Sequence, residues 1–477
     1  MCIIKNVLLM RMGSKQINRI KHPMHYCPPL ALKYVQAILN NSGNYNIFIL
    51  DNLLHFSHID NVCNKINKWE IDLLVISLST FTSQEGIELC ESIRKYKNIL
   101  IIGVGQDITA RYEDYMVMYK VFDILIRGEF EQEVACVINQ LNIVRDVREF
   151  IDGYHMRKSG KINFVKELDE LPLLQWDKEG LGQYPFIYPL RLNKRVLCGY
   201  LSSSRGCPHS CIFCSSAVRK SNGKKIRLRS VKKIVDEMVD FQKLGCNLIV
   251  FEDDNFTASS EHVFSVCKAI NQSGLGIKWV ANVRVDEITS QMLVAMKEAG
   301  CILLFFGVES GSKRIIDILS KNSRRIDWTK KAKEVFLKAR TIGIATCGLF
   351  IIGSPTETVG EIIESINLVK SLAPDIIKVH FFTVYPDSIA YKQFFNDGKE
   401  KYLLGQHHYL PPVFNMSKMS LSTLKKMQIK FYKSILFNPF FLFKHLRHYL
   451  VFHFLNFKMT KQLIKKTLFF LFSGTNK

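Results

Sequence analysis

The segment CPHSCIFC, at residues 207–214, is the most informative stretch of this 477-residue chain. It places three thiols, those of Cys207, Cys211 and Cys214, within eight residues, directly after an apolar run at 196–201 that predicts a buried strand. Thiolates this close together can converge on one metal centre, and an iron–sulfur cubane offers four irons for ligation. Three local ligands would leave one iron open, which is typical of a reactive metal site and not of a structural one.

A zinc site is the alternative for this segment, because His209 could join the three cysteines as a fourth ligand. The spacing permits such a set, although His209 lies inside the loop and zinc pairs are usually separated by a longer insert. The other ten cysteines are scattered singly and are expected to be small buried hydrophobic residues.

Downstream of the cysteines, apolar runs alternate with segments of helical spacing. Strands are predicted at 196–201, 247–252, 278–283, 301–307, 345–352 and 376–384. Helices are predicted at 230–244, 261–272, 289–299, 327–342 and 359–372, the last opened by a capping box at 358–361. Six strands with crossover helices favour a partial βα barrel over residues 196–400.

The same alternation upstream predicts a separate α/β domain over residues 1–145. Strands are expected at 7–10, 47–50, 73–76, 99–102 and 122–126, with helices at 30–40, 85–95 and 131–141. Short apolar strands alternating with helices indicate a parallel, doubly wound sheet of the flavodoxin or Rossmann type. Ligands of such sheets bind at the carboxyl ends of strands, where the candidate residues are Ser77, Ser79, Thr80, Gly103 and Gly105.

Residues 146–195 contain Gly and Pro turn signals and are predicted to be a linker. The composition of the whole chain, 47% hydrophobic and 23% charged, excludes a disordered or collagen-like protein. Thirteen cysteines in a chain of this length, with no signal-peptide pattern, favour a cytoplasmic enzyme with reduced thiols.

The formal charge of +22 is concentrated in a tail at residues 401–477, which has 13 Lys and Arg and neither Asp nor Glu. Because the first 400 residues carry only +9, the charge is weak support for a nucleic-acid partner. The tail is predicted to be helical, basic and Phe-rich. Its uncharged runs at 434–443 and 448–457 are ten residues each, short of the roughly 20 needed to span a bilayer.

Three interpretations of the tail stay open. We expect, as the main component, that its helices pack on the barrel by their Phe faces. An amphipathic helix of this composition could also lie on an anionic membrane surface or close over an apolar substrate. Cations interleaved with aromatic residues could instead contact RNA.

The spacing CxxxCxxC with an aromatic residue before the last cysteine, here Phe213, resembles the signature of radical S-adenosylmethionine (radical SAM) enzymes. The lead-in at 204–208 resembles the subset that carries an N-terminal cobalamin-binding domain. The resemblance extends over roughly residues 1–400, and its nearest groups are anaerobic cyclases and methylases acting on tetrapyrroles, lipids and natural products. Its further motifs lie at 28–30, 103–105, 127–129, 251–256, 284–286, 307–311 and 350–357.

This resemblance implies that Cys207, Cys211 and Cys214 bind a [4Fe–4S] cluster whose fourth iron is chelated by SAM. Reductive cleavage of SAM would give a 5′-deoxyadenosyl radical that abstracts a substrate hydrogen. With cobalamin as a further cofactor, the expected outcome is methylation of an unactivated carbon, and cyclisation or rearrangement stay open. The implied partners are a small-molecule or lipid-like substrate and an electron donor such as flavodoxin or ferredoxin.

The resemblance also implies a set of SAM-binding residues at the carboxyl ends of barrel strands. Glu252, Asp253 and Asp254 are candidates to accept hydrogen bonds from the SAM ammonium group, although the family's Gly-Gly-Glu segment is absent here. The alternative for these acidic residues is helix N-cap chemistry. The other candidates are Glu309 and Ser310 for the ribose, and Gly353 and Phe213 for the adenine, with turn chemistry as the alternative.

The cobalamin motif Asp-x-His-x-x-Gly is missing from the first βα loop, so no histidine is identified as a lower cobalt ligand. A radical SAM enzyme without functional cobalamin therefore stays open, as does a cobalamin sensor with a structural cluster. An RNA-modifying methylthiotransferase would need a second cysteine cluster in the first domain. The candidates Cys2, Cys27, Cys63 and Cys90 occur singly, which argues against it.

Overall fold

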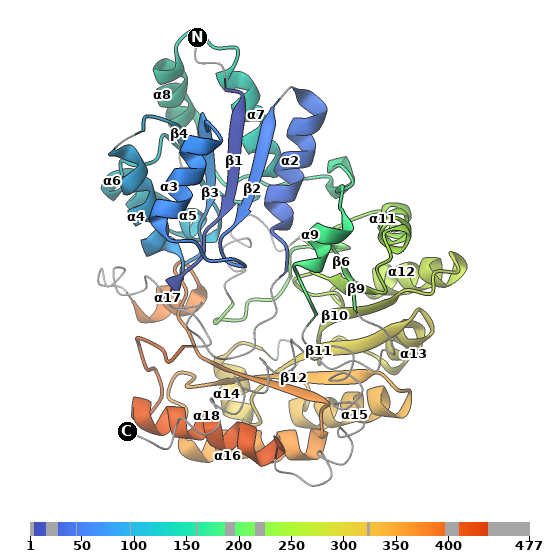
Figure 1. The fold of residues 1–477 in the computed structure, drawn as a ribbon. Helices are drawn as coiled ribbons and strands as arrows, with labels where there is room; N and C mark the ends of the chain where they lie inside the picture. The colour runs from blue at the N-terminus through green and yellow to red at the C-terminus, as the bar shows by residue number, and fades with distance from the viewer. Residues whose placement is uncertain are drawn as a thin grey trace.

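The computed structural model describes residues 4–15, 27–43, 45–95, 97–158, 161–186, 196–214, 225–321, 325–395 and 410–436. Two parallel sheets of five and six strands dominate this part of the chain, with the first sheet above the second in the view of Figure 1. A two-stranded antiparallel ladder accompanies them.

The first sheet is parallel throughout and has the order β2-β1-β3-β4-β5, as a doubly wound fold requires. Its strands are β1 Asn6–Arg11, β2 Asn46–Asp51, β3 Leu73–Ser77, β4 Leu100–Val104 and β5 Ile124–Leu125. Its helices are α2 Leu30–Ser42, α3 Ile59–Lys68, α4 Ser83–Arg94, α5 Gln106–Ala110, α6 Tyr112–Met118 and α7 Glu131–Leu141. The predicted doubly wound α/β class is confirmed.

Both faces of this sheet are buried, which explains its near-continuous apolar strands. On one face Val7 and Leu9 pack in a core with side chains of α2 and α7. On the other face Leu8 and Met10 pack with side chains of α3 and α4. The order also places β1 between β2 and β3, so the connections on its two sides run in opposite directions. A ligand crevice is expected at the carboxyl ends of β1 and β3.

The segment predicted as a linker contains α8 Val147–Lys158, the 3-10 turn η1 Leu168–Glu170 and α9 Lys178–Gly182. Tyr154 of α8 is buried in the core of the first sheet, whereas Leu181 and Tyr184 belong to the core of the second. This segment therefore packs on both sheets. The domain boundaries drawn from composition stay a prediction.

The second sheet has the order β13-β12-β11-β10-β9-β6, in which each strand pairs in parallel with the next. Its strands are β6 Cys198–Leu201, β9 Leu248–Phe251, β10 Lys278–Arg284, β11 Cys301–Glu309, β12 Ala345–Ile352 and β13 Ile376–Phe381. The flanking elements are β7 Ser204–Arg205, β8 Arg227–Leu228, α11 Val231–Lys243, α12 Ser260–Gln272, α13 Ser290–Glu298, α14 Lys313–Ile318, α15 Trp328–Thr341, α16 Val359–Leu372 and α17 Ile389–Phe394. This is the open, six-stranded barrel arrangement that the sequence predicts.

The predicted capping box of α16 is present. The Glu361 backbone N–H donates to Thr358 Oγ1, and the Glu361 side chain accepts from the Thr358 backbone N–H at 2.9 Å. The N-terminal carboxylate also favours this helix end electrostatically.

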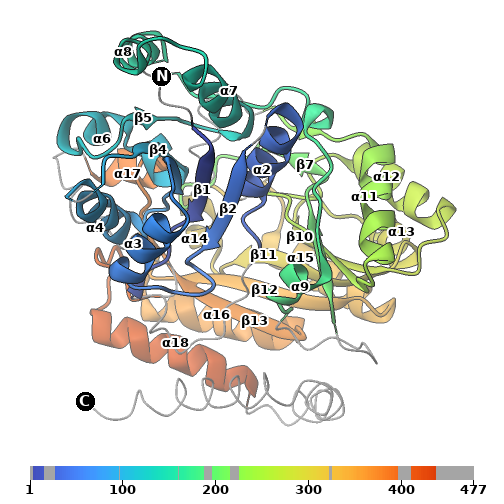
Figure 2. The same cartoon turned by 45° about the horizontal axis from the view of Figure 1, so that its top comes forward.

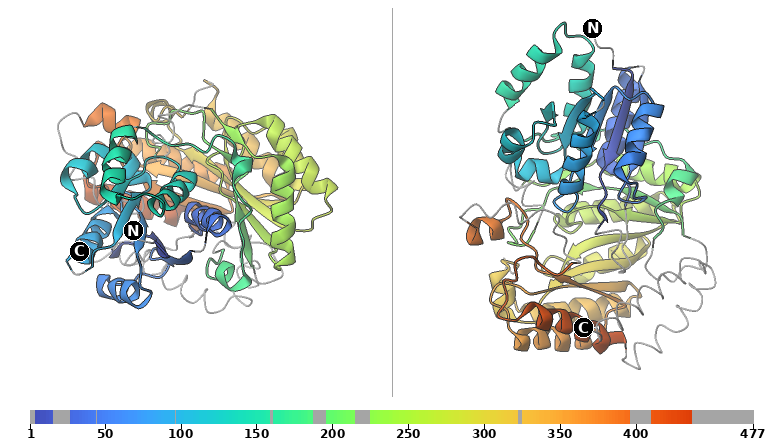
Figure 3. Two further views of the ribbon diagram at one scale, coloured as in Figure 1. Left: turned by 90° about the horizontal axis from the view of Figure 1, so that it is seen from above. Right: turned by 60° about the vertical axis from the view of Figure 1, so that its left-hand side comes forward.

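The carboxyl ends of the two sheets face each other. Figure 3 shows the first sheet above the barrel, and one cavity is lined both by Arg11 and Ser77 from the first sheet and by Ser202 and Glu252 beside β6 and β9. This arrangement puts the ligand edges of both sheets around a shared space.

Helix α18 Leu421–Leu436 lies beside α16 at the outer side of the barrel (Figure 2). Its Phe431 ring is fully buried 5.1 Å from the Phe350 ring centroid of β12, while Lys425 and Lys426 are exposed. The aromatic face of this part of the tail therefore packs on the barrel. None of the helices in the described ranges has the length and apolar character needed to cross a membrane.

Side chains of α18 also satisfy the edge strand β13. The Val379 N–H donates to Tyr432 Oη at 2.9 Å, and the Val379 carbonyl accepts from Gln428 Nε2 at 2.9 Å. A buried edge strand with unpaired backbone groups would be costly and prone to pairing with other chains, so α18 completes the barrel edge.

We therefore expect Tyr432→Phe to destabilise the protein by about 1–3 kcal/mol, because it leaves the buried Val379 N–H without its acceptor. Urea unfolding of the full chain measures the change. Lys425→Ala, on the exposed face of the same helix, is the control and should change stability by less than about 0.5 kcal/mol. Equal unfolding midpoints for wild type and Tyr432→Phe would contradict the role of this helix.

Candidate active site at the facing carboxyl ends

The cysteine loop 207–214 lies at the carboxyl end of the second sheet, after β7. Cys211 is buried at 5% exposure, and Cys207 and Cys214 are half-buried. The Cys214 N–H donates to the Cys211 carbonyl at 3.2 Å, and Ile212 bonds through its backbone to Leu319 at 3.2 Å and to Ala390 at 3.1 Å. Backbone contacts from two other segments therefore fix the middle of the loop.

Arg284, the last residue of β10, supplies a fixed positive charge to this loop. Its Nη1 lies 3.4 Å from Cys211 Sγ, and its Nε and Nη2 each donate to Asp286 at 2.9 Å. Burial disfavours the charged form, but the Asp286 carboxylate raises the pKa of Arg284 above its ordinary value. The structure thus places a permanent positive charge beside one sulfur of the predicted ligand set.

A second buried cation, Lys321, connects the loop to β11. Its Nζ lies 2.8 Å from Glu309 Oε1, with both side chains 7% exposed, and 5.8 Å from the centroid of the Phe213 ring. Burial lowers the pKa of Lys321, but the Glu309 charge outweighs this and raises it. Glu309 has a φ of 65°, a left-handed conformation that is costly for a side chain other than glycine and that this ion pair helps to hold.

The predicted ribose pair separates in the structure. Glu309 points to Lys321, whereas the Ser310 hydroxyl is fully buried 3.1 Å from the Ser365 hydroxyl and accepts from the Ser312 N–H. Ser310 thus forms part of the turn after β11, as the alternative of turn chemistry expects.

The donor chemistry of the loop fits an anionic iron–sulfur cluster, because three cysteines share one loop and two buried cations, Arg284 and Lys321, flank it. The three thiols are not closed into a ready-made ligand set, however. Across the described ranges, no three His, Cys, Asp or Glu side chains stand together as a metal site. Convergence of the thiols on a cluster therefore stays a prediction.

The imidazole of His209 contacts a glutamate from outside the cysteine loop. Its Nε2 lies 2.5 Å from Glu287 Oε1, and Glu287 Oε2 accepts from Asn255 Nδ2 at 2.7 Å. Burial would raise the pKa of Glu287, but the His209 contact outweighs it and lowers the pKa. The zinc alternative would have to break this contact to use Nε2 as a ligand.

The three acidic residues after β9 have three different surroundings. Asp253 is buried and accepts from the Ser203 N–H at 2.7 Å, the Ser203 hydroxyl at 2.6 Å and the Ser204 hydroxyl at 2.6 Å. Burial raises its pKa to about 6. Asp253 therefore braces β6 against β9. The N-cap of α12 is Ser259, so none of the three acidic residues caps that helix.

Asp254 and Glu252 line the cavity between the sheets. Asp254 Oδ2 accepts from the Gly206 N–H at 3.2 Å and so holds the entry to the cysteine loop. Glu252 hydrogen-bonds the thiol of Cys27, and burial raises the pKa of both groups.

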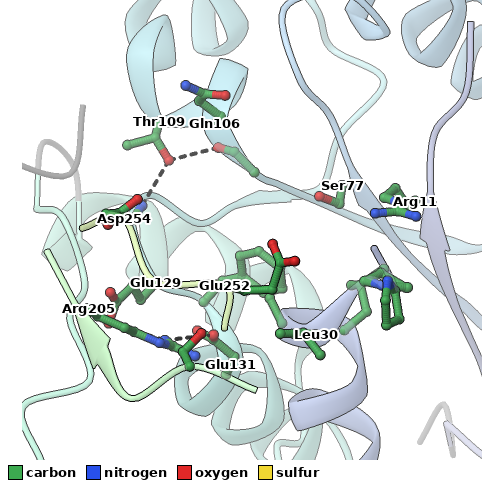
Figure 4. A pocket seen from close by; sticks show the side chains of 18 of the residues that line it. Arg11, Leu30, Ser77, Gln106, Thr109, Glu129, Glu131, Arg205, Glu252 and Asp254 are labelled. Atoms are coloured by element: carbon green, nitrogen blue, oxygen red, sulfur yellow. Dashed lines mark hydrogen bonds and ion pairs between the residues drawn. The ribbon is translucent and has the colours of Figure 1, made fainter. Parts of the chain in front are cut away.

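The cavity has a volume of about 420 Å³ and is shown in Figure 4. The carboxyl ends of the first sheet and the N-termini of α2 and α7 form one wall, and residues after β6 and β9 form the other. Its lining residues are Arg11, Pro28, Pro29, Leu30, Ala31, Leu32, Ser77, Gly105, Gln106, Thr109, Gly128, Glu129, Phe130, Glu131, Ser202, Ser204, Arg205, Glu252 and Asp254.

Two of the five candidates in the first sheet, Ser77 and Gly105, line this cavity, and the other three do not. Ser79 bonds to Thr82 in the turn before α4, and the Thr80 carbonyl accepts from Ser83 in the same turn. Gly103 faces the core, where a Cβ would lie within 3 Å of side chains such as Ile108 and Leu125.

Arg11 reaches the cavity from the end of β1. It donates to both oxygens of Asp51, at 2.8 and 2.5 Å, and the Asp51 carboxylate also accepts from Tyr184 Oη at 2.7 Å. No histidine is present among the described residues that line the cavity.

Gly353 begins the loop after β12 and has a φ of 81°, which favours glycine. The N–H groups of Gly353 and Ser354 both donate to Glu357 Oε2, at 2.6 and 3.1 Å. Burial raises the pKa of Glu357 to about 8. Glu357 therefore shapes the loop that was predicted to approach the adenine.

Sequence reasoning gave no role to Arg284, Lys321 or Glu357. Arg284 and Glu357 lie in segments that carry the family resemblance, so their positions were marked without a function. Lys321 lies outside those motifs, and its contact with Glu309 depends on how the segment after α14 folds back.

Because its pKa is raised, Glu357 makes the free energy of unfolding fall as the pH rises. The ordinary pKa of a glutamate, 4.5, rises to about 8 in the folded protein, so the unfolded chain loses this proton first as the pH rises. The free energy of unfolding should fall between these pH values by an amount on the order of 4 kcal/mol from this group. Glu357→Gln should flatten that part of the stability profile, measured by Tm between about pH 5 and pH 8.

Glu361→Gln, four residues further along the chain, is the control with the opposite sign. Although burial raises its pKa, contacts with Arg314 and Thr358 lower the pKa of Glu361 to about 2. Its stabilisation is therefore present above the ordinary pKa and lost at acid pH. The account of Glu357 is wrong if Glu357→Gln keeps the wild-type loss of Tm between pH 5 and 8.

Known proteins resemble this chain both in sequence and in fold. Residues 201–369 match the model of the Radical SAM superfamily. An uncharacterized methyltransferase of Pyrococcus horikoshii is 27% identical over 434 residues, 87% of this chain and 89% of that protein. The anaerobic magnesium-protoporphyrin IX monomethyl ester cyclase of Rubrivivax gelatinosus is 23% identical over 435 residues, 87% of this chain and 75% of that protein.

Among solved structures, the radical SAM methyltransferase TsrM from Kitasatospora setae, with cobalamin and a [4Fe–4S] cluster bound, aligns with a TM-score of 0.62. The alignment covers 81% of this chain and 74% of TsrM at 14% identity, which shows a shared fold. The family match begins at the end of β6, includes the cysteine loop and extends into α16. Such enzymes use a [4Fe–4S] cluster and SAM, and need a substrate and a reductant. Residues 201–369 of this chain form a domain of the Radical SAM superfamily.

Proposed function

We propose that this protein is a cobalamin-dependent radical SAM methyltransferase that acts on an unactivated carbon of a small-molecule, lipid or natural-product substrate. The observation that carries the proposal is the cavity between the carboxyl ends of the two sheets. A cofactor held by the first sheet there would face the loop with the three cysteines. The two sites of a two-cofactor reaction would then open on one space.

The barrel side of the site would hold the cluster and SAM. Cys207, Cys211 and Cys214 would be the cluster ligands, and Arg284 would offset their negative charge. We propose that Glu309, Phe213 and Gly353 face SAM. Glu309 ends β11, Gly353 follows β12 and Phe213 lies in the cysteine loop, so all three are at the same end of the barrel.

The first sheet would hold cobalamin. The lining combines hydrogen-bonding groups, such as Gln106 and Thr109, with apolar Pro28, Pro29 and Leu30, which suits a large ring that carries many amide groups. Glu131 Oε2 is buried without a hydrogen-bond partner among the described residues and could accept from such an amide. The described lining contains no histidine, so we propose that none of these lining residues supplies an imidazole ligand to cobalt.

When bound, the cluster and SAM supply the 5′-deoxyadenosyl radical, and cobalamin supplies the methyl group. The protein positions these groups and excludes water from them. The ion pairs of Arg284 and Lys321 keep two cations fixed beside the cysteine loop, and the facing sheet edges enclose the space where the substrate carbon would lie.

Methyl transfer is favoured over cyclisation because the Pyrococcus protein and TsrM are both named methyltransferases. Cyclisation is the second candidate, and the likeness to the Rubrivivax cyclase over 87% of this chain favours it. The two candidates share the cluster and SAM and differ in whether a methyl group is consumed.

A methylthiotransferase activity on RNA is disfavoured by the positions of the N-terminal cysteines. Cys27 bonds to Glu252, whereas Cys63 and Cys90 lie in the core of the first sheet. Cys2 is outside the described residues. Among the described residues these cysteines form no group of three metal-ligating side chains, so they offer no second cluster site.

Two partner predictions remain proposals. An electron donor such as flavodoxin or ferredoxin would reduce the cluster. The exposed lysines of α18, including Lys425, Lys426 and Lys430, could add attraction to an anionic membrane surface in a cytoplasmic enzyme with a lipid-like substrate.

Anaerobic reconstitution with iron and sulfide tests the cluster ligands. Wild type should gain iron–sulfur absorbance and about four irons per chain, the content of one [4Fe–4S] cluster. The variants Cys207→Ala, Cys211→Ala and Cys214→Ala should each lose most of this absorbance and iron, because each removes one of the three cysteine ligands. The exposed Cys136 provides the matched control, and Cys136→Ala should load like wild type. Loading of all four variants to the same level would refute the cluster assignment.

The products of SAM distinguish the two candidate reactions. With hydroxocobalamin, a reductant and substrate extracts, a methyltransferase should form S-adenosylhomocysteine together with 5′-deoxyadenosine, since one SAM provides the radical and another restores the methyl group. Liquid chromatography with mass detection measures both. Formation of 5′-deoxyadenosine without S-adenosylhomocysteine would favour the cyclase and contradict methyl transfer.

A further inference from the structure

The cysteine loop is closed at its base by the short ladder of β7 and β8. Arg205 of β7 pairs with Arg227 of β8. Arg205 directly precedes Gly206 at the entry to the cysteine loop, and Arg227 lies where the described chain resumes after residue 224. Two paired residues per strand form a weak ladder by themselves. Two arginines directly opposite each other also repel, so this base needs a counter-charge.

Two carboxylates supply the counter-charge, and that of Glu129 contacts both arginines. Arg227 donates through Nη2 to Glu129 Oε1 and through Nη1 to Glu129 Oε2, each at 2.7 Å. Arg205 Nη1 lies 3.4 Å from Glu129 Oε2 and 2.9 Å from Glu131 Oε1. Both glutamates belong to the first α/β unit, between β5 and the first turn of α7. The loop is therefore tied to the other sheet at both of its stems.

The surroundings make Glu129 a rigid anchor. Its Oε2 also accepts from the Val165 N–H at 2.9 Å, and its backbone N–H donates to the Asn163 carbonyl at 2.9 Å. The side chain is only 8% exposed. Burial would raise the pKa of Glu129, but the two arginines outweigh this and lower it, so the carboxylate stays charged. A buried charge with several hydrogen bonds holds a fixed geometry better than an exposed pair does.

Aromatic faces hold the two arginines from the side. The Arg205 guanidinium lies 5.6 Å from the centroid of the Tyr34 ring in α2, and the Arg227 guanidinium lies 5.1 Å from the Phe164 ring. Both rings come from outside the barrel sheet. Figure 4 shows Arg205 next to Glu131 and Glu129 on the wall of the cavity.

We propose that Glu129 is a positioning residue for the cysteine loop: one carboxylate of the first domain joins both stems of the loop and thereby sets where its three cysteines lie. The proposed function is needed only to explain why the cysteines must be held in place, which is to bind a cluster. The clamp itself is a property of the polypeptide and can be tested without a cluster or cobalamin.

Hydrogen–deuterium exchange of the full chain without cofactors tests the clamp. Glu129→Gln keeps the shape of the side chain and removes its charge. We expect peptides that cover 203–214 and 225–229 to exchange at least about tenfold faster than in wild type, since hydrogen bonds to a charged group contribute enough to change a local opening equilibrium by that factor. Peptides of β1, β3 and β4 should be unchanged.

Asp123→Asn is the matched control. Asp123 is also in the first α/β unit and accepts from Arg94 at 2.5 Å, but it precedes β5 and so lies at the opposite end of that strand. Its variant should leave exchange in the cysteine loop at the wild-type rate. Equal loop exchange in wild type and Glu129→Gln, or the same acceleration in Asp123→Asn, would overturn the proposal.

A second variant keeps the test informative if Glu129→Gln does not fold. Arg227→Gln removes the bidentate contact together with the contacts of Arg227 with the Val165 carbonyl and the Phe164 ring, and it should accelerate exchange of the same loop peptides. In addition, the double variant should show no further acceleration beyond the faster single variant, because both changes open one clamp. Additive effects would mean that the two residues stabilise the loop independently, which contradicts the proposal.

Cluster lifetime provides the functional readout. After reconstitution, loss of iron–sulfur absorbance to a chelator should be faster in Glu129→Gln and unchanged in Asp123→Asn. If wild type assembles no cluster, the proposed function fails while the exchange result still decides the clamp. If the cluster assembles and is lost at one rate in all three proteins, the cluster assignment stands and the positioning role is wrong.

Discussion

Parallel strands deliver their carboxyl-end loops to one edge of a sheet, and the structure depends on two such edges being turned toward each other. The first sheet brings Arg11, Ser77 and Gly105 to its edge, and the barrel brings the loop after β6 and the acidic residues after β9. The chemistry-bearing residues come from distant parts of the sequence but share one space because of this constraint. The segment of α8 to α9 contributes to both cores and so helps to hold the edges in this relation.

The facing edges are rich in buried charge, which must be paired to be tolerated. Arg284 with Asp286, Lys321 with Glu309, and Arg205 with Glu131 are ion pairs whose side chains are nearly all buried. Such pairs add little net stability relative to apolar packing, but they fix positions. Their concentration around the cysteine loop and the cavity fits a site that must hold charged cofactors in one geometry.

Much of the fold could be predicted from the sequence. The barrel strands and helices follow apolar runs and helical periodicity, and β12 and α16 have the predicted bounds. The two-residue strands β7 and β8 could not be predicted, because so short a ladder carries no periodic pattern. Helix α3 was also missed, since only Val62, Cys63 and Ile66 of its ten residues are buried.

The candidate site was predictable where the signal is local. The three cysteines are recognisable from their spacing alone, and Ser77 and Gly105 from their place at strand ends. Gly103 was wrongly placed with respect to the cavity, because strand position does not tell which space a glycine fills. The contacts of Glu129 with Arg227 join residues 98 positions apart, and those of Arg284 with Cys211 join residues 73 apart. Such contacts depend on the relation between elements and leave no mark in a single sequence.

The most direct test of the account is a cobalamin-binding titration that compares two serines of one segment. Ser77 lines the cavity, whereas Ser79, two residues later, bonds to Thr82 in a turn outside the described lining. Spectroscopic titration with hydroxocobalamin should give a Kd at least about tenfold higher for Ser77→Trp than for wild type, because a large ring would displace cofactor contacts worth more than about 1.4 kcal/mol. Ser79→Trp should bind like wild type. Tight binding by Ser77→Trp, or no cobalamin binding by wild type, would contradict a cofactor site between the facing sheets.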